Sequence, residues 1–164
     1  MLNASVLDQY PGVDTDAVQA LLEEKCRQDR HKIIVLDDDP TGVQTVHDVS
    51  VYTDWSYDSI KKGFEEDGKL FYILTNSRGF TVEQTTRAHL EIGETAAKVS
   101  EETGIDYVIV SRGDSTLRGH YPLETELLAR AEEKHRGRAV DGEIICPYFK
   151  EGGRFTIGNV HYVK

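Results

Sequence analysis

Aspartate and arginine side chains gather in a few short segments of the chain, and together they could bind a small anion and its hydroxyl groups. Three consecutive aspartates, Asp37–Asp39, precede the turn residues Pro-Thr-Gly. One of these carboxylates could bind substrate hydroxyls or accept a proton, while another holds a metal ion or a loop. The alternative is structural, with Asp37 and Asp39 capping the turn that follows.

Arginines form the second part of the pattern, and each one lies near a glycine: Arg78, Arg112, Arg118 and Arg154. The guanidinium group is a rigid donor fork that grips a carboxylate or phosphate at two points. A single exposed arginine is most often solvated or paired at the surface. Four arginines at one edge of an acidic protein predict instead an anion-binding pocket.

Hydroxyl groups and glycines surround the remaining aspartate of the pattern, Asp114. Ser115 and Thr116 follow it directly, and Gly113 and Gly119 would let backbone N–H groups approach a ligand. Ser115 lacks the Gly-x-Ser-x-Gly surroundings of a nucleophile, so a hydrogen-bonding role is predicted. The histidines form no His-x-x-x-His pair, and the site is predicted to hold no metal ion.

The overall charge excludes one class of partner. With 19 Lys and Arg against 29 Asp and Glu in 164 residues, the net charge is −10 and the pI is about 5.0. Nucleic acids and anionic membranes bind positive surfaces, so neither is expected as a partner. The sequence shows no disulfide framework, no signal peptide and no apolar run near the roughly 20 residues of a membrane span. We therefore expect a cytoplasmic protein, with a homo-oligomer left open.

Short apolar runs alternate with helical patterns along the chain. Strands are predicted at Lys32–Asp37, Val49–Thr53, Leu70–Thr75, Tyr107–Ser111 and, more weakly, Glu143–Cys146. Helices are predicted at Asp14–Arg30, Ser56–Asp67, Thr81–Thr103 and Tyr121–His135. The alternation predicts an α/β fold, with a mostly parallel sheet and helices on both faces in a Rossmann-like three-layer arrangement. Polar loops after four strands would then meet at one sheet edge, where ligands bind in such folds.

Two known families contain parts of these motifs, and the first is the haloacid dehalogenase superfamily. The spacing Asp37-x-Asp39-x-Thr41 after an apolar strand resembles its first motif, and Thr75 resembles its second. This resemblance implies a phosphatase with Asp37 as its nucleophile. No lysine matches the third motif, and Pro40 is unusual in the first.

The four-carbon acid sugar kinase family shares more of the sequence. The segment Asp38–Gly42 resembles its Asp-Asp-x-Thr-Gly signature, and Thr75–Arg78 resembles its Thr-Asp-Ser-Arg segment. Asp114–Gly119, followed by Glu124, resembles its most distinctive string, and Gly153–Thr156 its Gly-Arg-x-Thr segment. The four motifs occur in the family's order over most of the chain.

This resemblance implies the substrate-binding part of a kinase that uses ATP and Mg²⁺ to phosphorylate a hydroxyl of a sugar acid. The substrate would be a threonate, an erythronate or an oxo-tetronate. Asp38 and Asp114 are the candidate bases. The implied substrate-binding residues are Asp39, Arg78, Arg112, Ser115, Thr116, Arg118 and Arg154.

The resemblance also implies a domain organisation. Residues 1–30 would be an N-terminal helical extension, and residues 31–164 a sugar-acid-binding α/β domain that is truncated at its C-terminus. Nothing here corresponds to the family's C-terminal ATP-binding domain. We therefore expect this chain alone to bind neither ATP nor Mg²⁺ and to be inactive. A sugar-acid-binding module without catalysis is the remaining alternative.

Overall fold

Two compact units, Met1–Arg30 and His31–Lys164, make up the chain in the computed structural model, which describes residues 9, 11–137 and 139–163. The first unit contains helix α1 (Thr15–Gln28), as the sequence predicts. The carboxylate of Asp14 caps this helix and accepts a hydrogen bond from the Ala17 N–H at 3.0 Å. Among the described residues, no helix is long and apolar enough to cross a membrane.

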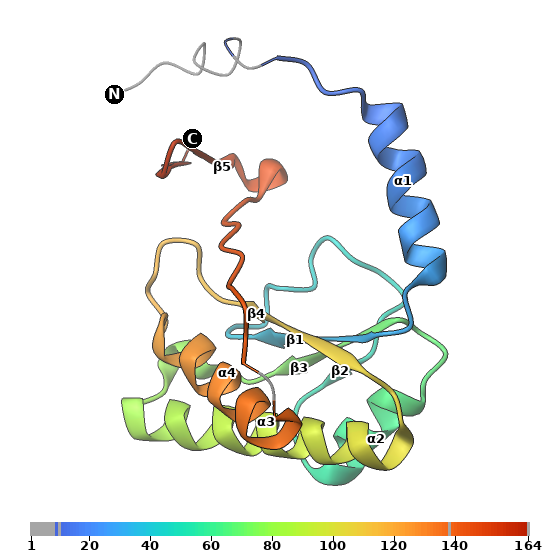
Figure 1. Ribbon diagram of the computed structural model, residues 1–164. Coiled ribbons are helices and arrows are strands. Elements are labelled where there is room, and N and C mark those ends of the chain that lie inside the picture. Colours follow the sequence, from blue (N-terminus) through green and yellow to red (C-terminus); the bar gives the residue numbers. More distant parts are fainter. Residues whose placement is uncertain (1–8, 10, 138, 164) are drawn as a thin grey trace. The chain divides into compact units, whose positions relative to one another are not determined.

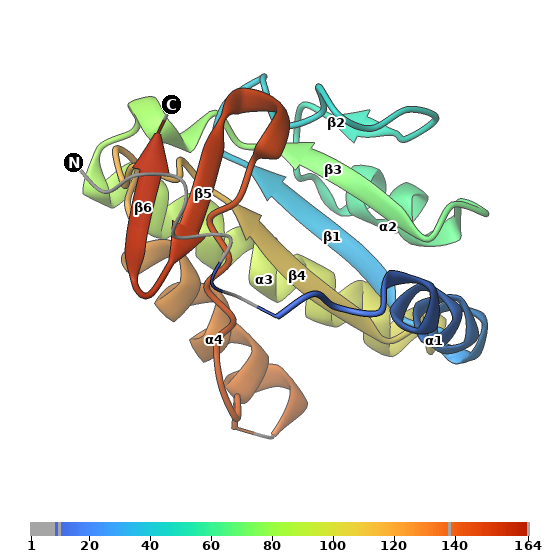
Figure 2. The same ribbon diagram turned by 90° about the horizontal axis from the view of Figure 1, so that it is seen from above.

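A four-stranded parallel sheet forms the centre of the second unit (Figure 2). Its strands are β1 (Lys32–Asp37), β2 (Val51–Tyr52), β3 (Leu70–Leu74) and β4 (Tyr107–Arg112). They lie in the order β2-β3-β1-β4, so that β1 has β3 on one side and β4 on the other. The predicted α/β class with a mostly parallel sheet is confirmed.

Three helices pack against one face of this sheet (Figure 1). They are α2 (Tyr57–Glu65), α3 (Val82–Thr103) and α4 (Leu123–Arg136). The core lies between these helices and the strands, where Ile34 and Phe71 meet Phe64 and Ile92 in a buried cluster. On the other face, β4 carries Val108, which is half exposed.

The ends of α3 follow directly from its sequence. The Thr81 hydroxyl accepts a hydrogen bond from the Gln84 N–H, and the Gln84 side chain accepts one from the Thr81 N–H. This capping box satisfies two N–H groups that the helix itself leaves unpaired. Gly104 ends the helix with φ 69°, a left-handed conformation that costs glycine little. Both ends agree with the predicted boundaries.

Close contact between α3 and α4 depends on a glycine. A Cβ atom on Gly93 would lie 2.6 Å from the Cβ of Ala131 in α4. We expect Gly93→Ala to lower the free energy of unfolding by about 1 kcal/mol, because the cost of overpacking exceeds the gain in helix propensity. Urea denaturation measures this difference, with Gly68→Ala as the control because its nearest neighbouring atom is 3.7 Å away. A Gly93→Ala variant as stable as the parent chain would contradict the prediction.

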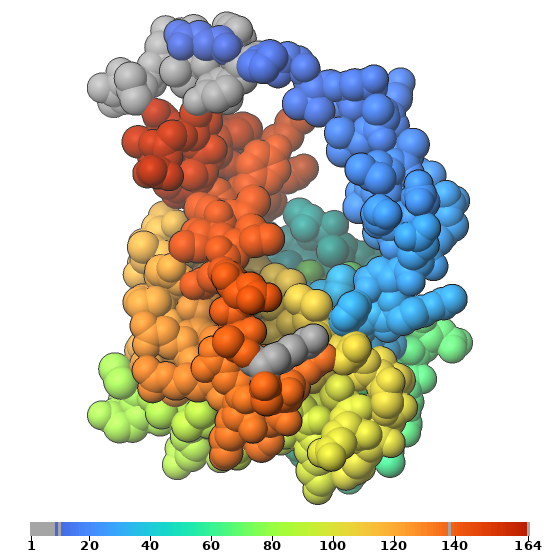
Figure 3. All heavy atoms as spheres, in the orientation of Figure 1, coloured from blue at the N-terminus to red at the C-terminus, as the bar shows by residue number. Residues whose placement is uncertain are grey.

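One predicted strand is wrong. Glu143–Cys146 forms no strand; its side chains lie on the surface of the unit (Figure 3), and Ile144 is 93% exposed. Two adjacent isoleucines make this run apolar, but its backbone pairs with no neighbouring strand among the described residues. The chain continues through the short 3₁₀ helix η3 (Lys150–Gly152) to an antiparallel hairpin of β5 (Arg154–Ile157) and β6 (Val160–Val163).

Candidate functional site

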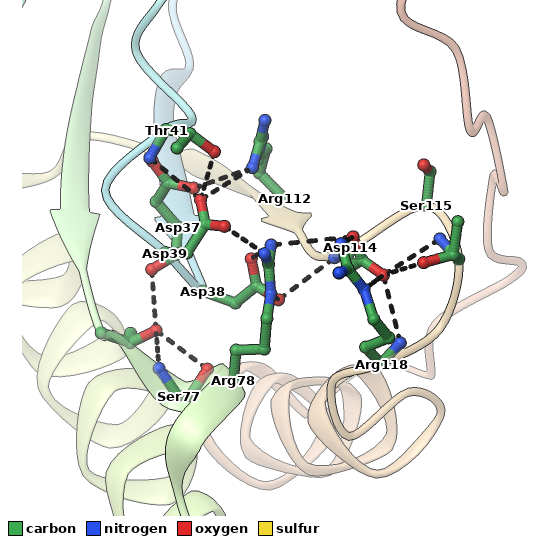
Figure 4. Close-up of polar contacts among 12 residues, drawn as sticks. Asp37, Asp38, Asp39, Thr41, Ser77, Arg78, Arg112, Asp114, Ser115 and Arg118 are labelled. Atoms are coloured by element: carbon green, nitrogen blue, oxygen red, sulfur yellow. Dashed lines mark hydrogen bonds and ion pairs between the residues drawn. The ribbon is translucent and has the colours of Figure 1, made fainter. Parts of the chain in front are cut away.

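The carboxyl ends of β1, β3 and β4 bring the predicted residues together. Asp37 at the end of β1 is in register with Leu74 of β3 and Arg112 of β4. The loops after these strands carry aspartates and arginines whose side chains point toward one another (Figure 4). The fourth predicted loop does not follow a strand of this sheet, but Arg154, the first residue of β5, donates a hydrogen bond to the Ser115 hydroxyl at 2.8 Å.

Asp38 and Arg78 form the central ion pair. The Arg78 Nε and Nη2 atoms donate to the two Asp38 carboxylate oxygens at 3.0 and 2.7 Å. The Asp38 side chain is 4% exposed, and the Asp114 N–H donates a further hydrogen bond to it at 3.1 Å. Arg78 lies in the 3₁₀ helix η2 (Ser77–Gly79), which follows Asn76 at φ 56°. Asparagine tolerates this left-handed conformation better than most residues, so it suits the turn that aims Arg78 at Asp38.

Asp39 is held by the loop that follows it and by the arginines. The Thr41 N–H and hydroxyl donate to one carboxylate oxygen at 2.9 and 2.5 Å, and Arg78 contacts the other. Burial raises the pKa of Asp39, but these hydrogen bonds and the positive charges of Arg78 and Arg112 outweigh it and hold the pKa below its ordinary value. Asp39 is therefore an ionised hydrogen-bond acceptor at neutral pH.

Asp37 lies in a different environment. Its side chain is almost fully buried, and Arg112 Nη1 lies 3.4 Å from one of its oxygens. Burial raises the pKa of Asp37 to about 6, although Arg112 and the Gly42 N–H oppose this shift. A Cβ atom at position 42 would lie 1.8 Å from the Asp37 carboxylate, so any larger residue there would displace that carboxylate. Asp37 is enclosed by its own loop.

Asp114 organises the loop after β4. Its carboxylate accepts hydrogen bonds from Arg118 Nε and Nη2 at 2.9 and 2.7 Å, and from the Thr116 N–H and hydroxyl. The Arg118 fork and the Thr116 hydroxyl hold the pKa of Asp114 far below its ordinary value, against the effect of burial. A carboxylate with so low a pKa is a weak base, which favours an orienting role for Asp114.

The three consecutive aspartates bring carboxylate oxygens together in the way that a cation site would. One oxygen of each residue in Asp37–Asp39 lies within 4.8 Å of the others, and oxygen ligands suit Mg²⁺. However, the guanidinium groups of Arg78 and Arg112 already contact carboxylate oxygens of all three residues. The arrangement therefore does not fit a metal ion, and no chemical step is assigned to one.

A search against known protein families connects this geometry with a class of ligand. The family described as "Sugar-binding N-terminal domain" matches residues 33–164, which include every residue of the site. The chain belongs to the sugar-binding N-terminal domain family. No curated protein and no solved structure matches it.

For a sugar-binding domain, the site offers both kinds of hydrogen-bonding group that a hydroxylated ligand needs. Aspartate oxygens accept from sugar hydroxyls, and guanidinium groups donate to oxygen atoms. Arg118 is the most open of the site's four arginines, with a side chain that is 63% exposed. Its hydrogen bonds to Asp114 use Nε and Nη2, so Nη1 can face a ligand.

Sequence reasoning missed one buried residue beside this site and gave no role to another. His89 in α3 is 1% exposed and lies near Glu124 of α4, which the motif comparison named without a role. The helical position of His89 on the buried stripe of α3 was the available signal. A lone histidine on such a stripe did not stand out, because its partner lies 35 residues away on another helix.

Proposed function

We propose that this sugar-binding domain binds a four-carbon sugar acid and is the substrate-binding part of an ATP-dependent kinase. The observation that supports this is the alternation of carboxylates and guanidinium groups at the carboxyl edge of β1, β3 and β4. A sugar acid carries one carboxylate for the arginines and several hydroxyls for the aspartates. A short ligand of this kind matches a site in which both groups lie a few ångströms apart.

Each residue then has a role in substrate binding. Arg112 and Arg118 bind the substrate carboxylate, while Arg78 steadies the transferred phosphoryl group. Asp39 accepts hydrogen bonds from substrate hydroxyls. Ser115 and Thr116 add hydroxyl contacts, and Arg154 extends the site from the segment that reaches Ser115.

Proton transfer from the attacking hydroxyl is assigned to Asp38 rather than to Asp114. The low pKa of Asp114 makes it a weak base. Asp38 Oδ2 accepts from Arg78 and from the Asp114 N–H, but Oδ1 accepts from Arg78 and has a second lone pair for a substrate hydroxyl. Asp114 then fixes the loop that carries Arg118.

ATP and Mg²⁺ enter the proposal only through a further nucleotide-binding domain of the whole kinase. In that arrangement ATP supplies the phosphoryl group, and this chain holds and orients the acceptor hydroxyl. The rival phosphatase function requires Asp37 as nucleophile. The enclosure of its carboxylate by Gly42 and Arg112 leaves that function with less support.

Calorimetry with erythronate and threonate tests the proposed function. We expect either acid to bind, and erythritol, the matched neutral polyol, to bind at least tenfold more weakly. Arg118→Gln is expected to weaken acid binding by about tenfold, since hydrogen bonds between charged groups contribute about 1.5–3 kcal/mol. The control is Arg130→Gln on the exposed face of α4, where Arg130 forms an exposed ion pair with Glu126. Equal binding of the acids and erythritol, or no binding of either acid, would contradict the proposal.

A further inference from the structure

A chain of polar side chains is buried beneath the candidate site. Four residues form this buried polar chain: Thr75, Ser77, His89 and Glu124, each of them at most 3% exposed. They come from four elements: the end of β3, the 3₁₀ helix η2, and the helices α3 and α4. Burying so many polar groups is unfavourable unless each one has a hydrogen-bonding partner.

Ser77 links Thr75 to Glu124 within this buried polar chain. Its hydroxyl donates to Glu124 Oε1 at 3.0 Å. The Thr75 hydroxyl lies 3.0 Å from the Ser77 oxygen and 2.9 Å from the backbone carbonyl oxygen of Asp37, and it can donate to one of them at a time. The contacts thus run from the backbone of β1 to a carboxylate of α4.

His89 is the partner of Glu124 on the side away from the site. Its Nδ1 lies 2.9 Å from the Thr85 carbonyl oxygen, which can only accept, so Nδ1 carries a proton. The other ring nitrogen, Nε2, lies 3.7 Å from Glu124 Oε1. Glu124 therefore lies between an imidazole from α3 and a hydroxyl from η2.

The second oxygen of Glu124 lies directly below the loop that follows β4. Cβ atoms added to Gly113 and Gly119 would come within 3.9 and 3.8 Å of Glu124 Oε2. The same Cβ atom on Gly119 would be 3.2 Å from an Asp38 oxygen. Glu124 thus lies close to the loop after β4 and contacts Ser77 of η2, although no described hydrogen bond joins its side chain to Asp38 or Arg78.

We propose that Glu124 is a positioning residue for the ligand site and that it acts through Ser77. Glu124 fixes Ser77, and Ser77 precedes Arg78, whose guanidinium binds Asp38 and Asp39. The Arg78 N–H also donates to the Asp38 carbonyl oxygen at 3.2 Å, and this bond ties η2 to the loop after β1. A shift of η2 would therefore disturb both this backbone contact and the ion pair between Arg78 and Asp38. The effect of Glu124 on ligand affinity rests on the proposed function, whereas its effect on the position of Arg78 can be tested without any ligand.

The substitution Glu124→Gln tests this role with little change in shape. It keeps an oxygen that can accept from Ser77 but removes the charge. We expect sugar-acid affinity to fall about tenfold, the lower end of the effect seen when the outer partners of metal ligands are changed. In the ligand-free protein, we expect the Arg78 Nε–H signal in a ¹⁵N NMR spectrum to exchange with water several times faster.

Glu132→Gln is the matched control on the same helix. Glu132 contacts Tyr107 and Arg136, away from the site, and is also partly buried. This variant is expected to change stability but neither the affinity nor the exchange of the Arg78 Nε–H. An equal loss of affinity in both variants, or an unchanged Arg78 signal in Glu124→Gln, would overturn the proposal.

Ser77→Ala gives an independent test if Glu124→Gln fails to fold. Loss of the single hydroxyl should accelerate exchange of the Arg78 Nε–H in the same way. Where both variants fold, the double variant should show little more effect than either single one, because both act through one contact. Fully additive effects would overturn the proposal. If the parent chain binds no sugar acid, the proposed function fails, and the Arg78 signal still decides the role of Glu124.

Discussion

Replacing Arg78 by alanine is expected to lower the free energy of unfolding by about 3 kcal/mol, because the change leaves the carboxylate of Asp38 buried without its counter-ion. Asp38 would keep only the Asp114 N–H among its described side-chain partners. Asp39 would lose a contact as well. Sugar-acid binding should also be lost, since Arg78 spans the loops after β1 and β3.

Urea denaturation measures the change in stability, and a second substitution tests its cause. Adding Asp38→Asn to Arg78→Ala removes the unpaired charge, so the double variant should be more stable than Arg78→Ala alone. Arg130→Ala is the control, because exposed ion pairs contribute at most about 1 kcal/mol. If Arg78→Ala lowers the free energy of unfolding no more than Arg130→Ala does, the buried ion pair between Arg78 and Asp38 is not a major contribution to stability.

Asp37→Asn is expected to change how stability depends on pH. The pKa of Asp37 is raised from 3.8 to about 6 in the folded state, chiefly by burial. The folded protein therefore holds this proton more tightly than the unfolded chain, and ionisation destabilises the fold as the pH rises from about 4 to 6. A shift of this size corresponds to about 3 kcal/mol. The stability of Asp37→Asn relative to the parent chain should rise by about that amount between pH 4 and pH 7.

Asp114→Asn provides the opposite sign under the same measurement. The pKa of Asp114 is lowered in the folded state, so its ionisation stabilises the fold above the ordinary aspartate pKa, and this contribution is lost as the pH falls through and below that value. Asp114→Asn should therefore be less stable than the parent chain at pH 7, with the difference shrinking in acid. Urea titrations from pH 3 to pH 7 measure both variants. A constant difference for Asp37→Asn across pH 4–7 would refute the assigned environment of its carboxyl group.

Local sequence signals predicted most of the elements of the fold. Apolar runs such as Ile33–Leu36 indicated buried parallel strands, and Thr81 and Gly104 marked the ends of α3, because both signals depend on neighbouring residues. The run at Glu143–Cys146 gave a wrong strand prediction for the same reason. Its apolar residues are local, but a strand also needs a partner, which no local pattern reports.

The sequence predicted where in the fold the site lies, but not which side chains contact one another. Parallel strands bring Asp38, Arg78 and Asp114 to one edge of the sheet, and this placement does not depend on the contacts of their side chains. Which arginine binds which aspartate depends on backbone turns such as the one at Asn76. The pairing of His89 with Glu124 depends on how α3 packs against α4, which tertiary structure alone determines.

The balance of charges at the strand ends affects how the site can select a ligand. Four arginines in an acidic chain suggested a positive pocket, but the structure sets Asp37, Asp38, Asp39 and Asp114 among them. Opposite charges at such short range cancel at a distance, so the site exerts little long-range pull on anions in general. A free phosphate or an acetate ion would gain little from it. Recognition then requires a molecule whose carboxylate and hydroxyl groups match the positions of the arginines and aspartates, and net negative charge alone is not sufficient.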